Sequence, residues 1–419
     1  MADAHGSGPC DSNIMRVQVP FPALKLFTKV KTPFFGVFSF IFERKLCAMR
    51  IIKGIVYTKD FRFEPGIVTI ENDKIVSVEN CDREDLEKEE RNHYILPGLV
   101  DIHFHGCAGY DFCDGTKEAM QAIEAYENAH GITSLCPATM TLPIKRLEEI
   151  CSAAAEYRGS SIRGIYLEGP FVSEKKKGAQ NPAYIRKPDL KLLDHLQECS
   201  GGLIKIAAIA PEIEGAMECI QEGNGRFRFS IAHTCADYET ASEAMEKGAL
   251  HVTHLYNAMP PFNHREPGVA GAASDHDRTV VELICDGVHV HPSMIRNTFR
   301  LFGDDRVILI SDSMMAAGMP DGVYELGGQK VLVKGNLAAL ENGAIAGSVT
   351  NLYDCMVTAI SMGIPKESAI RAATWNPAGA IGIEKEYGTL ETGKKADILI
   401  TDLDFELQEV IKSGIAFLI

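Results

Sequence analysis

Short apolar runs recur through the middle of the chain and alternate with segments of helical periodicity. The runs lie at residues 94–102, 132–138, 162–167, 204–210, 227–232, 251–255, 280–285 and 307–310. Two of the helical segments between them are Lys117–His130 and Tyr238–Gly248, and the second ends at its glycine. Apolar runs that alternate with helices are typical of a parallel sheet covered on both faces. Eight such units predict an α/β fold, a (β/α)8 barrel of the TIM type.

The pattern changes after the eighth run. Residues Met314–Ala346 show no clear period, so we expect an irregular stretch there. Helical periodicity returns in Ser348–Met362 and Lys366–Ala373.

Both ends of the fold have a different, strand-like pattern. Arg50–Val78 alternates as short strands with a turn at Asn72-Asp73, and Ala396–Asp402 and Gly414–Ile419 are strand-like again. We therefore predict a small β-sandwich domain built from residues 49–96 and 387–419, with the barrel at residues 97–386.

Residues 1–48 do not match either pattern. Met1–Asn13 is small and polar, and Pro33–Phe42 is apolar with lysines before it, like the core of a signal peptide. No A-x-A cleavage site follows, and the apolar stretch is too short to span a bilayer. We expect residues 1–48 to be a disordered extension outside the fold, with Met49 as a candidate natural start.

Composition limits the kinds of molecule that the protein can bind and indicates its cellular compartment. The chain has 419 residues and a formal net charge of -15, which argues against nucleic acid and anionic membranes as partners. Its twelve cysteines include no C-x-x-C pair, which argues against a zinc ribbon or a dithiol redox motif. We expect a reducing, cytoplasmic location.

Polar residues end several of the predicted barrel strands. They are His103 and His105 after the first run, Glu168 after the third, His233 after the fifth, His254 in the sixth and Asp312 after the eighth. Taken singly, each histidine has an ordinary explanation as a hydrogen-bonded core residue, and the aspartate as a helix N-cap. In a barrel, however, the carboxyl ends of all strands meet at one face, where the chemistry occurs. Four imidazoles and two carboxylates there suit one or two divalent ions, such as zinc or iron, with room for a water.

Several short motifs then point to a known family. They are Pro97–Gly106, Glu168–Phe171, Thr253–Pro260, Arg265–Gly268, Asp286–Val290, Ser311-Asp312, Ala373–Ala378 and Gly393–Ile398. With them the sequence resembles the amidohydrolase superfamily and, within it, the N-acetylglucosamine-6-phosphate deacetylases, from Arg50 to Asp404. The first and last motifs are general to the superfamily, whereas Thr253–Pro260 and Asp286–Val290 are specific to the deacetylases.

The resemblance implies roles for the metal-site residues. Glu168, His233 and His254 would hold the main metal ion. His103 and His105 would complete a second position, with Glu168 as the bridge that is a carboxylated lysine in many other amidohydrolases. Asp312 would be the general base and later the general acid.

The resemblance also implies substrate contacts. Asn257 and Ala258 would contact the sugar, and Arg265 and His289 would bind the phosphate, within one subunit or across a homodimer interface. Gln180 stands where some relatives carry a histidine that faces the acetyl carbonyl; an amide donates a hydrogen bond but carries no charge. For Lys175–Lys177, a solvated loop face is favoured over a phosphate site.

The implied reaction is hydrolysis of the acetamide of N-acetylglucosamine 6-phosphate to glucosamine 6-phosphate and acetate. Alternatives are the galactosamine epimer, or another amidohydrolase reaction on a cyclic amide or a deaminated base. A neutral base would not require the Arg265 and His289 pair. A metal-free scaffold homologue is disfavoured by the complete ligand set.

Overall fold

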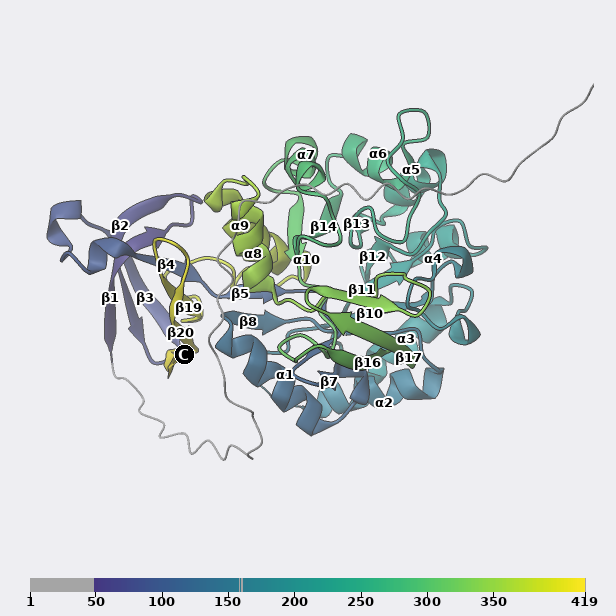
Figure 1. The fold of residues 1–419 in the computed structure, drawn as a ribbon, viewed down its shortest axis with the longest axis horizontal. Coiled ribbons are helices and arrows are strands. Elements are labelled where there is room, and N and C mark those ends of the chain that lie inside the picture. Colours follow the sequence, from purple (N-terminus) through teal and green to yellow (C-terminus); the bar gives the residue numbers. More distant parts are fainter. Residues whose placement is uncertain (1–48, 158, 160, 419) are drawn as a thin grey trace, which may run out of the picture. The chain divides into compact units, whose positions relative to one another are not determined.

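The computed structural model describes residues 49–157, 159 and 161–418 (Figure 1). The disordered extension predicted for residues 1–48 therefore lies outside the described residues, as does the end of the last predicted strand at Ile419.

The middle of the chain forms a closed parallel barrel, as predicted. Within the described residues its strands occupy eight positions: β5 (Leu99–Asp101), β8 (Ile132–Leu135) with its continuation β9 (Ala138–Thr139), β10 (Ile165–Phe171), β11 (Ile204–Ile209), β12 (Arg228–Ile231), β13 (His251–Val252), β14 (Val280–Ile284) and β15 (Val307–Ile310). Neighbours pair in parallel from β9 to β15, and β5 pairs with β8. The ring closes beyond the strand ends, where the Asp312 N–H donates to the His103 carbonyl at 2.9 Å and the His105 N–H donates to the Ser313 carbonyl at 2.7 Å.

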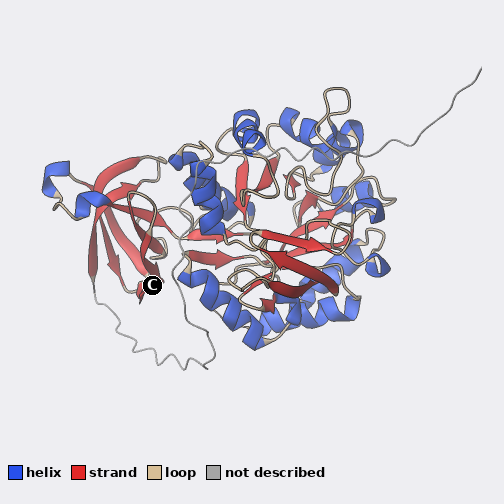
Figure 2. Cartoon of the chain, in the orientation of Figure 1, coloured by secondary structure: helices blue, strands red, loops and turns tan. Residues whose placement is uncertain are grey.

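Helices follow the barrel strands and cover them (Figure 2). They are α1 (Lys117–Ala129), α2 (Ile144–Glu156), α3 (Leu190–Cys199), α4 (Ala216–Gly223), α5 (Tyr238–Lys247), α6 (Gly268–Asp275), α7 (Pro292–Phe302), α8 (Leu352–Ser361), α9 (Lys366–Ala373) and α10 (Trp375–Ala380). N-capping side chains fix where several helices begin. At α1 the Thr116 hydroxyl accepts from the Ala119 N–H, and at α5 the Asp237 carboxylate accepts from the Thr240 N–H. Among the described residues, no helix has both the length and the apolar character that a membrane span requires.

The barrel interior is filled by side chains rather than open. Buried apolar residues from every second position meet there, including Val100, Tyr166, Ile206 and Ile308. Ala378 of α10 belongs to the same cluster. This packing makes the barrel a rigid support for whatever its strand ends carry.

Strands from both ends of the described chain form one further sheet. Its order is β21 (Ile415–Leu418), β20 (Leu407–Lys412), β19 (Ile398–Asp402), β4 (His93–Pro97), β1 (Arg50–Tyr57), β2 (Phe63–Glu71) and β3 (Lys74–Asn80). The sheet curls around its own apolar core, which includes Val68, Ile95 and Ile398. The Ile75 N–H donates to the Lys394 carbonyl at 2.9 Å and joins the edge strand β3 to the segment that leads into β19. The predicted sandwich therefore takes the form of a single curled sheet.

The stretch predicted to be irregular contains a small antiparallel sheet, so that prediction was wrong. Its strands are β16 (Gly322–Leu326), β17 (Gln329–Lys334) and β18 (Leu337–Leu340). Val331 and Val333 face inward onto Met140 and Met314. The alternation was obscured because Leu332 lies on the outer face and is 59% exposed, so consecutive apolar residues point to opposite sides.

Candidate active site

The five side chains predicted to hold metal and Asp312, the predicted general base, meet at the carboxyl end of the barrel. They form two groups, His103 with His105 and Asp312, and Glu168 with His233 and His254, and within each group the candidate ligand atoms lie within 4.8 Å of one another. All six residues are buried. Glu168 lies within β10, and the other five residues follow β5, β12, β13 and β15. The polar side chains of these strands therefore lie at the same end of the barrel. His103 and Asp312 share one point, with Nε2 and Oδ1 3.9 Å apart, as the predicted barrel requires.

The Glu168 group brings three candidate ligand atoms close to one position. His233 Nε2 and His254 Nε2 lie 3.0 Å and 3.1 Å from Glu168 Oε1, and 3.2 Å from each other. His233 Nδ1 donates to the Lys176 carbonyl at 2.9 Å, so in the neutral ring its Nε2 presents a lone pair to the carboxylate. Lone pairs this close repel unless a cation lies among them, so this donor set fits a divalent ion.

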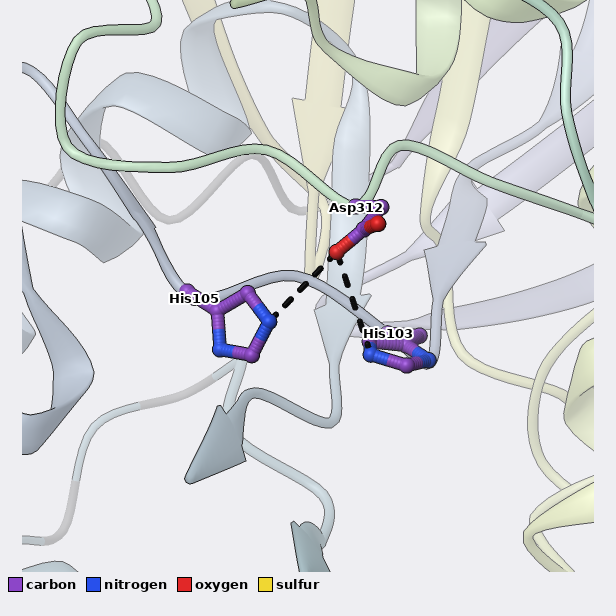
Figure 3. Close-up of side chains that lie close together, drawn as sticks. All are labelled: His103, His105 and Asp312. Atoms are coloured by element: carbon purple, nitrogen blue, oxygen red, sulfur yellow. Dashed lines mark ion pairs between the residues drawn. The ribbon is translucent and has the colours of Figure 1, made fainter. Parts of the chain in front are cut away.

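The second group lies on the other side of Glu168. Figure 3 shows His103 and His105 pointing toward Asp312; His105 Nε2 is 3.4 Å from Asp312 Oδ1. Glu168 reaches both histidines, with Oε1 3.4 Å from His103 Nε2 and Oε2 3.2 Å from His105 Nε2. Within the described residues, His103 Nε2 is buried without a hydrogen-bond partner. A cation at this position would supply the missing partner, and Glu168 is placed to serve both positions.

The charges of the cluster favour bound cations. Burial would raise the pKa of Glu168, but in the metal-free cluster the charge favoured on His103 and the side-chain contacts with His103, His105 and His233 outweigh it and hold the pKa well below its usual range. Burial opposes charge on His105, but hydrogen bonds to Asp312 and Glu168 raise its pKa to about 10. The carboxylates thus stay ionised and attract protons onto the imidazoles, and a metal ion would take the place of those protons.

Three of the six residues have strained backbones. The φ angles of His233, His254 and Asp312 are 44°, 29° and 49°, in the left-handed region that residues other than glycine rarely adopt. Each such residue costs on the order of 1–3 kcal/mol and persists only where the surrounding structure holds it. Here the strain occurs directly after β12, β13 and β15, where the chain turns and leaves the side chain pointing into the site.

A cavity of about 380 Å³ opens onto the two groups. This volume suits a small polar ligand. Of the predicted substrate residues, Asn257, Ala258, Gln180 and His289 line the cavity, together with Leu326 and Ala346 from the small antiparallel sheet and its neighbouring loop. Arg265 does not line it within the described chain; residues 261–266 are exposed throughout.

His289 presents to the cavity an imidazole whose charged form is favoured by Asp286. Its Nδ1 lies 2.7 Å from Asp286 Oδ2, and its backbone N–H donates to Asp286 Oδ1 at 2.9 Å. Burial disfavours the imidazolium, but the bond to Asp286 outweighs it and raises the pKa of His289. An imidazole whose charged form is favoured in this way suits a phosphate or another anion.

Gln180 uses both ends of its amide inside the protein. Nε2 donates to Glu168 Oε2 at 2.7 Å, and Oε1 accepts from the Thr141 N–H at 2.7 Å. The same region is tight, because a Cβ at Gly169, where φ is 108°, would collide with the Thr141 hydroxyl. The glutamine therefore fixes the Glu168 carboxylate; the second hydrogen of its amide contacts Met140 Sδ at 3.7 Å.

Sequence reasoning missed two residues behind the site, Glu282 and His251. Both are fully buried, and Glu282 accepts from His103 Nδ1 and His251 Nε2, each at 2.8 Å. Burial would raise the pKa of Glu282, but the charge and hydrogen bonds of the two histidines lower it to about 2. The signal was present, since Glu282 is a charged residue in the middle of the apolar run Val280–Ile284. The pattern that identified the other site residues includes only strand ends, and Glu282 lies in the middle of a strand.

Known proteins share this architecture. The profile of the Amidohydrolase family matches residues 94–417. The N-acetylglucosamine-6-phosphate deacetylase of Bacillus subtilis is 38% identical over 393 residues, 88% of this chain and 97% of that protein. The N-acetylgalactosamine-6-phosphate deacetylase of Escherichia coli O157:H7 is 32% identical over 335 residues, 78% of this chain and 88% of that protein.

A solved structure extends the likeness to three dimensions. It is a mutant N-acetyl-D-glucosamine-6-phosphate deacetylase from Mycobacterium smegmatis in complex with N-acetyl-D-glucosamine 6-phosphate. It superposes with a TM-score of 0.83 at 32% identity, over 88% of this chain and 99% of that chain. The likeness thus covers most of this chain and nearly all of that structure.

Proposed function

The chain belongs to the amidohydrolase family, and from this premise we propose that it hydrolyses the acetamide of N-acetylglucosamine 6-phosphate to glucosamine 6-phosphate and acetate. The observation that carries the proposal is the cavity in which Glu168 joins two buried donor groups beside Asp312. The relatives named above act on, or are bound to, 6-phosphorylated N-acetyl amino sugars. In this proposal the barrel, residues 97–386, carries the reaction, and residues 49–96 and 387–419 form the small domain.

The metal-holding roles follow from the two groups. Glu168, His233 and His254 would hold the main ion, and His103 and His105 a second one, with Glu168 between them. When bound, such an ion supplies Lewis acidity, which lowers the pKa of a water molecule and polarises a carbonyl. Zinc and iron fit imidazole and carboxylate donors, and elemental analysis of the purified protein would identify the ion and its stoichiometry.

Asp312 is the proposed proton carrier. Its carboxylate faces the site from the end of β15, and burial is outweighed by the hydrogen bond to His105 and the neighbouring imidazoles, which lower its pKa. It is therefore ionised and able to take a proton from the attacking water. Returning that proton to the sugar nitrogen makes the amine a leaving group.

The substrate would be held along the cavity wall. Asn257 and Ala258 line the cavity beside the metal groups. The Gln180 N–H that contacts Met140 Sδ in this structure is proposed to turn to the acetyl carbonyl when substrate binds. His289 is proposed to bind the phosphate. Arg265 lies on an exposed loop and does not line the cavity of its own subunit. This placement supports a homodimer in which Arg265 completes the phosphate site of the partner subunit.

Replacing Arg265 by alanine is expected to raise KM strongly for the phosphorylated sugar and little for the plain sugar. A charge-assisted contact to phosphate contributes about 1.5–3 kcal/mol, which corresponds to ~10- to 150-fold. Steady-state kinetics with N-acetylglucosamine and its 6-phosphate would measure the difference. Equal effects on the KM of both sugars would show that Arg265 does not bind the phosphate.

Hybrid dimers would test whether Arg265 acts across an interface. One subunit carries Arg265→Ala and the other carries Asp312→Asn. If Arg265 acts across the interface, the subunit with native Asp312 receives the native Arg265 of the other subunit, and one of the two sites is complete. We expect the low KM of the native protein to return on mixing, in the hybrid fraction. If native mass spectrometry shows hybrids and the KM stays as high as in the Arg265→Ala parent, Arg265 serves its own subunit or no site.

The reaction itself is tested by acetate release. A panel should contain the 6-phosphates of N-acetylglucosamine and N-acetylgalactosamine, the plain sugars and a cyclic amide. We expect the highest kcat/KM with N-acetylglucosamine 6-phosphate. The galactosamine epimer is the second candidate because one relative, at 32% identity, is named for it. No release from any phosphorylated sugar by the metal-loaded protein would overturn the proposal.

A cytoplasmic location completes the proposal. The ten cysteines in the described part of the chain all carry free thiols. Free thiols are typical of a reducing compartment. Cell fractionation would test this location.

A further inference from the structure

Glu282 is a fully buried carboxylate in the barrel wall, behind the metal groups. It lies at the centre of β14, where it is paired with Ile308 of β15, and it is 0% exposed. It does not line the cavity and it belongs to neither group of candidate ligands. A charge at such a position is costly unless the surrounding structure compensates it fully.

Both carboxylate oxygens of Glu282 are used. Oε2 lies 2.8 Å from His103 Nδ1 and accepts from the His254 backbone N–H at 3.1 Å, and Oε1 lies 2.8 Å from His251 Nε2. His103 and His251 are themselves 0% exposed. One side chain thus connects strand ends that carry ligands of both metal groups.

The contact with Glu282 fixes the orientation and the tautomer of the His103 ring. An ionised carboxylate only accepts, so His103 Nδ1 carries a proton toward Glu282. Nε2 faces Glu168 and Asp312, and with a metal ion bound it would present its lone pair there. In contrast, His105 Nδ1 and His254 Nδ1 are buried without a hydrogen-bond partner in the described residues. In the other group His233 is fixed by a neutral acceptor, the Lys176 carbonyl. His103 is therefore the candidate ligand whose far nitrogen is held by a carboxylate.

We propose that Glu282 is a positioning residue, which sets the tautomer and basicity of His103 and thereby the affinity of the second metal position. A carboxylate behind a ligating histidine orients the ring and makes it a better donor. The inference rests on the proposed function only in taking His103 as a metal ligand. Its test measures metal binding without substrate, so it stands or falls separately from the deacetylation.

The Glu282→Gln variant is expected to bind the second metal equivalent about 10- to 100-fold more weakly, the usual cost of losing such a partner. An amide has one accepting oxygen and a donating NH₂ group, so it cannot accept from both His103 and His251. The first equivalent, at His233 and His254, should be retained. Titration of metal-free protein with zinc against a competing chelator would measure both affinities, and the absorption spectrum of the cobalt-loaded protein would report the geometry.

Glu127→Gln is the matched control. Glu127 is another fully buried glutamate, on α1, and its carboxylate makes no hydrogen bond to the metal groups. The Glu127→Gln substitution should leave both zinc affinities unchanged. Thermal unfolding of the metal-free forms separates a general loss of stability from a loss of binding. Unchanged affinities in Glu282→Gln, or equal losses in both variants, would overturn the proposal.

A measurement on the unaltered protein covers the case in which Glu282→Gln does not fold. In the zinc-loaded protein with labelled histidine, we expect the His103 Nδ1 proton far downfield and slow to exchange, as in a hydrogen bond to a buried carboxylate. A His103 ring whose Nδ1 carries no such proton would contradict the proposed arrangement.

Discussion

Replacing Asp312 by asparagine is expected to lower kcat by about 10²- to 10⁴-fold, the usual contribution of a general acid–base group, while metal and substrate still bind. The amide keeps the shape of the carboxylate but does not take a proton. Asp312 shares its Oδ1 with His105 at 3.4 Å and with His103 at 3.9 Å, so the amide oxygen preserves those contacts. Kinetics, together with elemental analysis of the same preparation, would separate the two effects.

The pH profile provides a second readout for Asp312. Its pKa is lowered in the folded protein, because its neighbours outweigh burial, so the carboxylate is ionised at neutral pH and activity is lost only as the pH falls through that low value. If Asp312 alone sets the acid limb of kcat/KM, that limb should flatten in the variant. A variant that keeps metal and a near-native kcat would move the proton-transfer role elsewhere, with His233 as the first residue to test.

Replacing His254 by alanine is expected to remove the main metal ion and the activity together. Only Glu168 and His233 would remain of that group, and catalytic metal sites ordinarily need three protein ligands. His103→Ala should remove at most one equivalent, because the Glu168 group stays complete. Metal content per chain and acetate release, measured side by side, would show the difference.

The same pair of variants tests the hierarchy of the two positions. If His254→Ala and His103→Ala lose equal amounts of metal and equal activity, the two groups form one cooperative site rather than a main and a second position. The Glu282→Gln variant should resemble a mild form of His103→Ala, because it acts through the same imidazole.

The barrel and its metal-site residues were predictable because each observation reinforced the others. His103, Glu168, His233 and Asp312 each end an apolar run, and the barrel fold places all such ends on one face. No single run would have sufficed, since an isolated histidine after a strand is usually structural. The family motifs then supplied roles that spacing alone does not give.

Other features depend on contacts that are distant in sequence. Nothing near Glu282 in the chain indicates that it lies 2.8 Å from His103, because β14 and β5 come together only when the barrel closes. The bond from Gln180 to Glu168 depends on a loop whose path is set by tertiary packing. The small sheet β16–β18 was missed because its exposed apolar residues, Val323 and Leu332, obscure the two-residue period.

The pairing of β4 with β19 has a consequence for how the protein is made. Ile95 lies opposite Ile400, so the partner of β4 is translated only after the entire barrel. At usual translation rates the delay is about 15–60 s, during which the ribosome-bound chain presents β1–β4 with one edge unpaired. Such an edge is a template for aggregation. The curled sheet, whose strands β1–β4 are made before the barrel, is therefore completed only after it, and its open edge needs shielding in the meantime.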